Sequence, residues 1–459
     1  MTQPKLSLSN IFKAYDIRGI TPTELNPHVA HSIGRAFADF MPKGKIAVGR
    51  DMREDSDELA HGLIAGLLRQ GREVIDLGQI TSDTMYFAVG KYGYAGGAMI
   101  TASHNPGKYD GIKLTGKNVV PIGIDSGLLK IEKEIETHQY KKMCSDAKAK
   151  NIIEHKDITK EWVEHALGVA GQITKPINIG IDTGNGMAAI YLPYLKELTP
   201  LKIRSIYTKL DGSFPNHPAN PLEPNNTKHL QELVINNHLH CGIAFDGDGD
   251  RAFFIDEKGQ RVSASILGTI LAEHIIDLHP HATVLYNVII SHILPETVNQ
   301  LGGEAIRTKV GHSFIKQQMK LHKAQFAAEH SGHYYYKDNY NADSGLITAL
   351  MVLSILSQKN IKLSELANKY QKYFNSPELN FETNNIQENI NVLKNHFKDG
   401  KLESLDGITI VYKDWWFNAR PSNTEPFLRV NIEAKSQELL NEKTTEIKNL
   451  LHQKRKLTI

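Results

Sequence analysis

The sequence predicts an α/β protein in which three similar domains with mixed, largely parallel sheets precede a smaller C-terminal α+β domain. One order of elements occurs three times along the chain: a buried strand, an amphipathic helix, a break and a second strand. Each copy is followed by a further apolar strand that ends in a polar loop. Beyond about residue 375 the chain becomes polar and rich in Asn. Three copies of this unit indicate three related domains.

The spacing of apolar residues and the helix-ending signals place the elements of each copy. The first strand, the helix and the second strand are expected at 45–51, 56–69 and 73–77, then at 177–182, 187–198 and 202–206, and finally at 283–287, 292–300 and 305–307. Residues 184–186 lack the full spacing of a dinucleotide-binding loop, so a tight turn is expected there. The predicted domains have the bounds 1–150, 151–256, 257–372 and 373–459.

Composition excludes several classes of partner. The 459 residues carry a formal net charge of +2, so neither nucleic acid nor an anionic membrane is expected as a partner. The cysteines Cys144 and Cys241 provide no disulfide framework. We expect no signal peptide, because the first residues lack a basic region followed by an apolar core, and no apolar run approaches the ~20 residues that span a bilayer. We expect a cytoplasmic monomer or dimer.

The polar loop of the first copy suits a nucleophile. An apolar strand leads into residues 101–104, and the Asn-Pro-Gly segment that follows forces a turn. Ser103 is therefore expected at the mouth of a strand, where its hydroxyl needs a base, a metal or an attached phosphoryl group to work. His104 and Lys113 are near in the sequence and could assist this hydroxyl. Taken alone, the stretch is explained equally well as a plain turn.

The polar loop of the second copy is the most explicit in its chemistry. It places Asp246, Asp248 and Asp250 at alternate positions between glycines, so three hard oxygen ligands can face one divalent cation. Without a cation or basic partners, these charges would repel one another strongly. An EF-hand is rejected because Arg251 stands where that loop needs glycine and because both flanks are predicted strands. Mg²⁺ beside a serine suits phosphoryl transfer.

The polar loop of the third copy suits a sugar. Glu329 and Ser331 can accept from and donate to vicinal hydroxyls. His333 titrates near neutrality and can act as an acid or a base. His330 is expected to be a structural or surface imidazole, and residues 334–336, all Tyr, are expected to pack as a strand.

A fourth loop, in the α+β domain, completes a set of motifs. It offers an anion a guanidinium, two hydroxyls, an amide and backbone donors from Arg420, Ser422, Asn423 and Thr424. In chain order the motifs are AYDIRG at 14–19, TASHNP at 101–106, DGDGDR at 246–251, EHSGH at 329–333 and RPSNTEP at 420–426. Together they resemble the defining loops of the α-D-phosphohexomutase superfamily, in its phosphomannomutase/phosphoglucomutase branch.

The resemblance extends over essentially the whole chain and implies four domains around a central cleft. Ser103 would carry a phosphoryl group and would bind Mg²⁺ together with Asp246, Asp248 and Asp250. Glu329 and Ser331 would bind sugar hydroxyls. The distal phosphate would be bound by Arg420, Ser422, Asn423 and Thr424. Further cleft positions are matched by Tyr15, Arg18, His104, Lys113, Arg251, His312 and His333. Arg18, Lys113 and His333 all remain candidates for proton transfer.

The activity implied by the resemblance is the interconversion of mannose 6-phosphate and mannose 1-phosphate, and of the corresponding glucose phosphates. It would pass through a phosphoserine and a hexose 1,6-bisphosphate, which also serves as activator. Asn423, where phosphoglucosamine mutases typically have glycine, favours this branch over that alternative. A non-catalytic sugar-phosphate-binding protein and a magnesium-dependent phosphatase are the alternatives from other classes.

Two positions depart from the pattern of the superfamily. Many bacterial members have a lysine in the segment that here reads Asn-Val-Ile-Ile at 287–290, so one of their phosphate contacts has no counterpart at Ile289. The sugar loop usually opens with Gly-Glu, whereas Ala328 precedes Glu329 in this chain.

Overall fold

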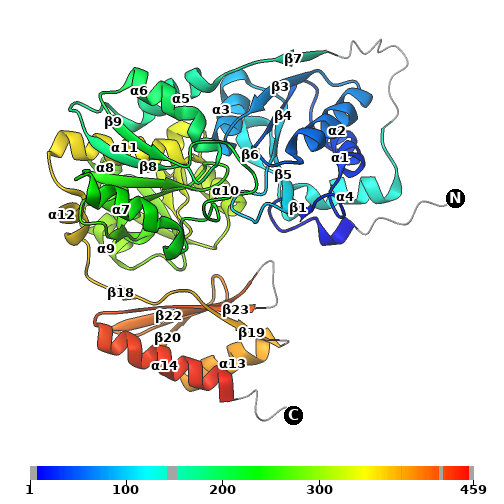
Figure 1. Cartoon of the computed structure of the whole chain (residues 1–459). Coiled ribbons are helices and arrows are strands. Elements are labelled where there is room, and N and C mark those ends of the chain that lie inside the picture. The colour runs from blue at the N-terminus through cyan, green and yellow to red at the C-terminus, as the bar shows by residue number, and fades with distance from the viewer. Residues whose placement is uncertain (1–7, 142–151, 384, 423–426, 454–459) are drawn as a thin grey trace.

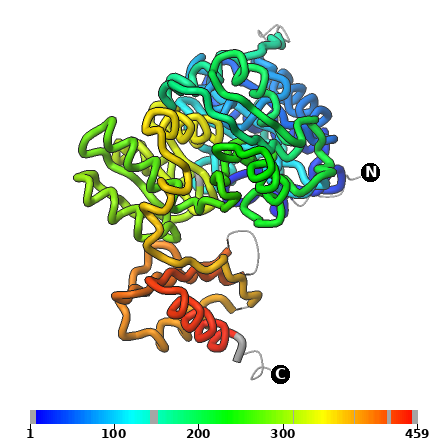
Figure 2. Tube along the Cα trace, turned by 60° about the vertical axis from the view of Figure 1, so that its left-hand side comes forward, coloured from blue at the N-terminus to red at the C-terminus, as the bar shows by residue number. Residues whose placement is uncertain are grey.

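The structure is a computed structural model that describes residues 8–141, 152–383, 385–422 and 427–453. Its strands form four sheets, of which three are mixed and the last is antiparallel. The three mixed sheets and their helices form one large body, and the C-terminal sheet and its helices lie apart from it (Figure 1). The same separation is seen in the turned view (Figure 2). The predicted fold class is confirmed.

The first sheet has the order β1-β5-β4-β2-β3-β7, and β6 pairs with β5. Its strands are β1 (Ile17–Ile20), β2 (Ile46–Arg50), β3 (Val74–Gln79), β4 (Gly96–Ile100), β5 (Tyr109–Gly116), β6 (Val120–Pro121) and β7 (Ile153–His155). Its helices are α1 (Pro27–Phe40), α2 (Ser56–Arg69), α3 (Ser82–Tyr92) and α4 (Leu128–Thr137), with short 3-10 turns η1 (Leu8–Asn10), η2 (Lys117–Val119) and η3 (Ile124–Ser126).

The second sheet has the order β12-β11-β10-β8-β9, and the third has the order β14-β13-β15-β16-β17. The strands of the second are β8 (Asn178–Asp182), β9 (Lys202–Ile206), β10 (Cys241–Phe245), β11 (Ala252–Asp256) and β12 (Arg261–Val262). Those of the third are β13 (Thr283–Asn287), β14 (Glu304–Thr308), β15 (Phe326–Ala328), β16 (Tyr334–Tyr336) and β17 (Ala342–Asp343).

Helices surround these two sheets, and an antiparallel sheet follows them. The helices are α5 (Thr159–Ala170), α6 (Leu192–Leu198), α7 (Lys228–Asn236), α8 (Ala264–Leu278), α9 (Ile293–Gln300), α10 (His312–His322), α11 (Gly345–Lys359) and α12 (Leu363–Asn368), with 3-10 turns η4 (Met187–Tyr191), η5 (Pro224–Thr227) and η6 (Lys337–Asn339). The last part contains β18 (Phe374–Asn375), β19 (Leu379–Glu382), β20 (Lys401–Glu403), β21 (Ile408–Val411), β22 (Trp415–Pro421), β23 (Phe427–Ala434), α13 (Ile386–His396) and α14 (Gln437–Gln453).

The three mixed sheets share one topology, as the repeated sequence unit predicts. In each, two strands of the unit pair in parallel, the later apolar strand (β4, β10 or β15) pairs in parallel with the first, and an antiparallel strand (β5, β11 or β16) follows. The helix predicted at 56–69 has those bounds. The one predicted at 187–198 is a 3-10 turn followed by α6, which has Pro193 in its first turn.

Residues beyond 150 contribute to the first sheet. The strand β7 lies where the second domain is expected to begin, and it pairs in parallel with β3 at the edge of the first sheet. Pairing between strands so far apart in the chain depends on tertiary structure, and the local sequence of three residues does not encode it.

The hydrophobic core consists of several clusters, which follow the grouping of the sheets into a large body and a separate last domain. One buried cluster runs from Ala47 to Tyr370 and joins all three mixed sheets. A second lies under the helices α1 and α2. The C-terminal sheet has a cluster of its own, from Phe381 to Leu451. The last domain therefore has an independent core.

Candidate active site

Each mixed sheet presents one polar loop at the carboxyl end of a central parallel strand. We call these the serine loop (101–108, between β4 and β5), the aspartate loop (246–251, between β10 and β11) and the sugar loop (329–333, between β15 and β16). The ends of parallel strands are where α/β sheets bind ligands. A cleft of about 760 Å³ lies over the serine loop, and its lining includes Tyr15, Arg18, Ser103, His104, Lys113 and His333.

Ser103 lies where the serine loop meets the aspartate loop. Its Oγ donates to Asp246 Oδ2 at 3.0 Å and lies 3.2 Å from His104 Nδ1. Its backbone is left-handed, with φ of +51°, a conformation that costs a residue with a Cβ about 1–2 kcal/mol. The loop therefore holds the hydroxyl in a conformation that the serine does not prefer by itself.

The aspartate loop fits a divalent cation. One carboxylate oxygen from each of Asp246, Asp248 and Asp250 lies within 4.8 Å of the others, and all three residues are buried. Asp248 Oδ1 and Asp250 Oδ1 are buried acceptors without a hydrogen-bond partner among the described residues. Buried carboxylate oxygens of this kind are suitable ligands for Mg²⁺. The flanks β10 and β11 are strands, which confirms the rejection of an EF-hand.

Two basic side chains compensate the charge of this loop. Lys113 Nζ donates to Asp248 Oδ2 at 2.6 Å and to Asp250 Oδ2 at 2.7 Å. Arg251 pairs with Asp246 Oδ2 at 2.8 Å. The sequence suggests both Arg251 and Lys113 as sources of positive charge beside the metal loop, and the structure adds which aspartates each of them contacts.

The surroundings set the charges of these groups. Burial raises the pKa of Asp246 to about 7, although Arg251 opposes this shift. Burial also favours neutral Asp250, but Lys113 and His333 hold the pKa of Asp250 well below its usual value. Burial disfavours the charge on Lys113, yet Asp248 and Asp250 raise its pKa well above normal. Lys113 is therefore a fixed cation.

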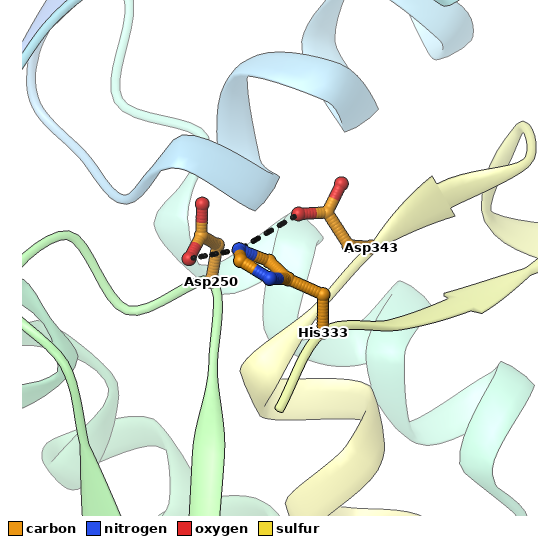
Figure 3. A group of neighbouring side chains, drawn as sticks. All are labelled: Asp250, His333 and Asp343. Atoms are coloured by element: carbon orange, nitrogen blue, oxygen red, sulfur yellow. Dashed lines mark ion pairs between the residues drawn. The ribbon is translucent and has the colours of Figure 1, made fainter. Parts of the chain in front are cut away.

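His333, from the sugar loop, lies between two buried carboxylates (Figure 3). Its Nε2 is 3.5 Å from Asp250 Oδ1 and 4.0 Å from Asp343 Oδ2, and its Nδ1 is 2.9 Å from Ser331 Oγ. Burial opposes the imidazolium, but Asp250 and Asp343 raise the pKa of His333 above its ordinary value. This trio could also hold an ion by geometry, but it offers two carboxylates where the aspartate loop offers three, and Mg²⁺ prefers oxygen ligands. The aspartate loop is thus the better metal candidate.

Glu329 is buried and held in place by three donors. Its Oε1 accepts from Gly311 N at 3.1 Å and from Asn287 Nδ2 at 3.3 Å, and its Oε2 accepts from the Tyr335 hydroxyl at 2.5 Å. Tyr335 belongs to the buried strand β16, so the predicted packing role of the three tyrosines is confirmed. Tyr335 additionally orients the carboxylate of Glu329.

In the last domain, Arg420 on β22 lies directly opposite Arg429 on β23. Both pair with Glu378, Arg420 at 2.5 Å and Arg429 at 3.4 Å. Ser422 N donates to Phe427 O at 2.8 Å, next to the turn. Asn423 and Thr424 lie outside the described residues.

Of the remaining predicted residues, Tyr15 and Arg18 line the cleft. Arg18 Nη1 donates to Asn105 Oδ1 of the serine loop at 2.7 Å, and the Tyr15 hydroxyl donates to Val310 O at 3.2 Å. His312 is the first residue of α10, and its side chain lies outside the described part of the structure. Ile289, in the segment that departs from the pattern of the superfamily, is buried just after β13.

The structure adds cleft residues that the motifs do not contain. Lys13 and Arg429 both line the cleft with Ser103. Lys13 directly precedes the AYDIRG motif, and Arg429 follows RPSNTEP on the next strand. A hairpin predicted over 415–434 would place Arg429 opposite Arg420 on the neighbouring strand, so the sequence does contain a signal for Arg429.

A serine beside a carboxylate loop of magnesium type, in a cleft that Arg18, His333 and Arg429 also line, defines a phosphotransferase. Family models described as phosphoglucomutase/phosphomannomutase alpha/beta/alpha domains I, II and III match residues 9–142, 160–259 and 263–373, and the C-terminal domain model matches 378–450. The chain belongs to the phosphoglucomutase/phosphomannomutase family, whose members are magnesium-dependent, and it is an intramolecular phosphotransferase.

Individual relatives are similar over nearly their whole length. A phosphomannomutase of Escherichia coli is 35% identical, with 96% of this chain and 98% of the relative covered. A phosphomannomutase of Methanocaldococcus jannaschii is 38% identical, with 96% and 97% covered. The crystal structure of a phosphoglucomutase/phosphomannomutase family protein from Burkholderia thailandensis superposes with a TM-score of 0.88 at 30% identity, covering 96% of this chain and 97% of that one. None of the helices in the described ranges is long and apolar enough to cross a bilayer.

Proposed function

We propose that this enzyme interconverts mannose 6-phosphate and mannose 1-phosphate, with the corresponding glucose phosphates as a second substrate pair. The observation that carries the proposal is the meeting of Ser103 Oγ with Asp246 Oδ2 at 3.0 Å in a cleft that His333 and Arg429 also line. The phosphomannomutase relatives support mannose as the sugar.

The reaction we propose has two mirrored phosphoryl transfers. Phosphorylated Ser103 gives its phosphoryl group to the free hydroxyl of a hexose monophosphate: the bond from phosphorus to Oγ breaks, a bond to the sugar oxygen forms, and the hydroxyl proton leaves. The hexose 1,6-bisphosphate then turns over in the cleft and returns its other phosphoryl group to Ser103. Added bisphosphate would act as activator because it phosphorylates resting enzyme.

Ser103, Asp246, Asp248 and Asp250 are the residues that would hold Mg²⁺. Bound there, Mg²⁺ would supply charge neutralisation for the phosphoryl oxygens. Lys113 and Arg251 add fixed positive charge beside the same oxygens. His104, whose pKa burial lowers well below its ordinary value, stays a neutral hydrogen-bonding group next to Ser103.

We assign the proton transfer to His333. A guanidinium such as that of Arg18 does not lose its proton in proteins, and the pKa of Lys113 is raised well above normal by Asp248 and Asp250, despite burial. Of the three side chains, an imidazole has the ordinary pKa closest to neutrality, and His333 lines the cleft. His333 would therefore take the sugar hydroxyl proton in one direction and return it in the other.

The other predicted residues would recognise the substrate. Glu329 and Ser331 would bind sugar hydroxyls, and Tyr15 and His312 would line the cleft around the ring. Arg420, Ser422, Asn423 and Thr424 would bind whichever phosphate is not transferred, and we add Arg429 to this group because it lines the cleft. We further propose a cytoplasmic location, which suits the buried free thiol of Cys241.

Mass spectrometry of the purified protein tests the proposal. After incubation with Mg²⁺ and α-D-glucose 1,6-bisphosphate, we expect one phosphoryl group, on Ser103, in wild type and in Ser32→Ala but none in Ser103→Ala. Mannose 1-phosphate should then discharge it, with mannose 6-phosphate detected by phosphorus NMR. Unmodified Ser103 would favour a sugar-phosphate-binding protein. Release of inorganic phosphate without isomerisation would favour a phosphatase, and turnover of glucosamine phosphates alone would favour a phosphoglucosamine mutase.

A further inference from the structure

Arg53 is a buried arginine that none of the functional motifs contains. It follows β2, is 4% exposed, and lies behind the serine loop rather than in the cleft. Arginine is seldom buried to this degree unless its charge and donors are matched. Its guanidinium nevertheless contacts the backbone of the reacting serine, Ser103.

All five N–H donors of the Arg53 guanidinium are used. Nε donates to Asp51 Oδ2 at 3.2 Å. The other four donate to backbone carbonyl oxygens of the serine loop and its exit: Ser103 O at 2.8 Å, Asn105 O at 2.8 Å, Pro106 O at 3.1 Å and Tyr109 O at 2.8 Å. A single rigid group thus binds three carbonyls of the loop and one at the start of β5, and one of these four is the carbonyl of Ser103 itself.

Arg53 is in turn fixed by its neighbours. Asp51 Oδ1 accepts from Arg53 N at 2.9 Å and from Ser56 Oγ at 2.7 Å. Ser56 Oγ also lies 2.7 Å from Asp110 Oδ2, at the start of β5. The guanidinium is therefore held by a network that connects the end of β2 to the start of β5, the two strands that flank β4 in the sheet.

The second domain closes over the same arginine. The ring centroid of Phe214 is 5.2 Å from the guanidinium carbon. A Cβ on Gly212 would lie 2.5 Å from Arg53 Cα, and a Cβ on Gly107 of the serine loop would lie 2.6 Å from Gly212 O. Arg53 is thus packed between the serine loop and a segment of the domain that carries the aspartate loop.

We propose that Arg53 is the positioning residue that holds the serine loop in its left-handed conformation, so that Ser103 Oγ faces the aspartate loop. This inference rests on the proposed function, because it concerns how the carrier serine is placed. The loop has an unfavourable φ at Ser103 and only short local hydrogen bonds of its own, such as Ser103 N to Thr101 Oγ1 at 2.9 Å. Four donors from a rigid fork supply the remaining constraint, and a lysine with three donors on a flexible chain cannot reproduce that geometry.

The expected effect is on catalysis more than on substrate binding. In Arg53→Ala, kcat and the rate of Ser103 phosphorylation by α-D-glucose 1,6-bisphosphate should fall by about 100-fold, as expected for a reacting group displaced by about 1 Å. KM for mannose 1-phosphate should change by less than about threefold, since the sugar loop and the last domain bind the substrate. Guanidinium chloride, well below denaturing concentration, should restore part of the rate, whereas sodium chloride should not.

Arg72→Ala is the matched control. Arg72, in the same domain, likewise donates to several backbone carbonyls, those of Ala38, Met41 and Pro42, but these lie away from the serine loop. Its replacement should lower the melting temperature and leave kcat and the Ser103 phosphorylation rate unchanged, with no response to guanidinium.

The outcomes distinguish a failure of the Arg53 positioning role from a failure of the proposed function. A folded Arg53→Ala with kcat within about threefold of wild type, or with a loss that guanidinium does not reverse, would overturn the positioning role. If Arg53→Ala does not fold, Arg53→Lys decides: a fall in kcat of tenfold or more at unchanged KM supports the role, and an unchanged kcat overturns it. A wild type that is never phosphorylated on Ser103 would overturn the proposed function, and the inference with it.

Discussion

Asp248 uses one carboxylate oxygen to pair with a basic side chain, and its other oxygen is available to a cation. Lys113 and Ser82 both contact its Oδ2, while its Oδ1 is buried without a hydrogen-bond partner among the described residues. A buried acceptor left in this state is costly. A cation that takes up this oxygen therefore gains a ligand whose desolvation has already occurred on folding.

Replacing Asp248 by Asn should weaken Mg²⁺ binding. The amide keeps the shape but loses the charge and one oxygen ligand, so the affinity for Mg²⁺ should fall by at least about tenfold, as measured by calorimetric titration. Asp256→Asn is the control, because Asp256 lies at the other end of β11 and its Oδ1 only accepts from Lys258 N and Gln260 N. Equal affinities for Asp248→Asn and wild type would remove Asp248 from the metal site.

Asp83 connects the three mixed-sheet domains at a single buried carboxyl. Its Oδ1 accepts from the Tyr191 hydroxyl at 2.8 Å and its Oδ2 from Ser344 Oγ at 2.7 Å, while Thr81 bonds it locally. Burial raises the pKa of Asp83 to about 7, against the lowering effect of these donors. The folded protein therefore binds a proton that the unfolded chain has released by pH 5.

This raised pKa gives a signed dependence of stability on pH. Because the folded-state pKa is the higher one, the contribution is fully present below the unfolded value near 4 and is lost as pH rises to about 7. The full difference corresponds to roughly 4 kcal/mol. Asp83→Asn does not titrate, so the melting temperature of wild type relative to this variant should fall between pH 5 and pH 8. A difference that stays constant over this range would contradict the assignment, and Asp277→Asn, at an exposed position, should show none.

At the scale of elements, the close pairing of α1 and α2 depends on glycine. A Cβ on Gly66 would lie 2.1 Å from His31 O and one on Gly34 would lie 2.2 Å from Leu63 O, so the two helix backbones touch. Gly66→Ala should destabilise the protein by about 1–3 kcal/mol in denaturant unfolding, because the backbone itself must move. Gly168→Ala in α5 meets no atom within 4 Å and should stabilise by about 0.5–1 kcal/mol. Equal effects of the two substitutions would show that helix propensity, not packing, determines the response.

The elements were largely predictable because their signals are local. The strand and helix periodicity of 45–51 and 56–69 is carried by neighbouring residues, and β2 and α2 match it. The pairing of strands and side chains, in contrast, is not encoded locally. Strand β7 joins the first sheet by pairing with β3, and Lys113 of the first domain pairs with Asp248 of the second. Motif residues could be proposed for the site, whereas the contacts of Arg53 are with tertiary neighbours that no spacing in the sequence reveals.

At the scale of the whole molecule, the last domain is joined to the rest by polar contacts. Arg307 pairs with Glu403 at 2.5 Å, Val310 N donates to Asp406 Oδ2 at 2.9 Å and His292 N donates to Glu433 Oε1 at 3.0 Å. The core of the last domain does not continue into the large body, whose own core joins three sheets. Interfaces of this kind permit movement between domains, and the proposed reaction would need such movement for the cleft to admit and enclose a hexose phosphate.

Calorimetry of the full chain should therefore resolve two unfolding transitions, the larger from the three-sheet body and the smaller from residues beyond about 375. Without a shared apolar core, the last domain gains little from the body and unfolds on its own. α-D-glucose 1,6-bisphosphate contacts both parts in the proposed complex, so at about 100 times its dissociation constant it should add roughly 2.7 kcal/mol to the folded state and bring the transitions together. Glu403→Gln, which weakens the Arg307 contact, should separate the transitions further in the free protein and leave the body's midpoint unchanged. One transition in the free protein, with the same midpoint in Glu403→Gln, would mean that the polar interface couples the domains as strongly as a shared core does.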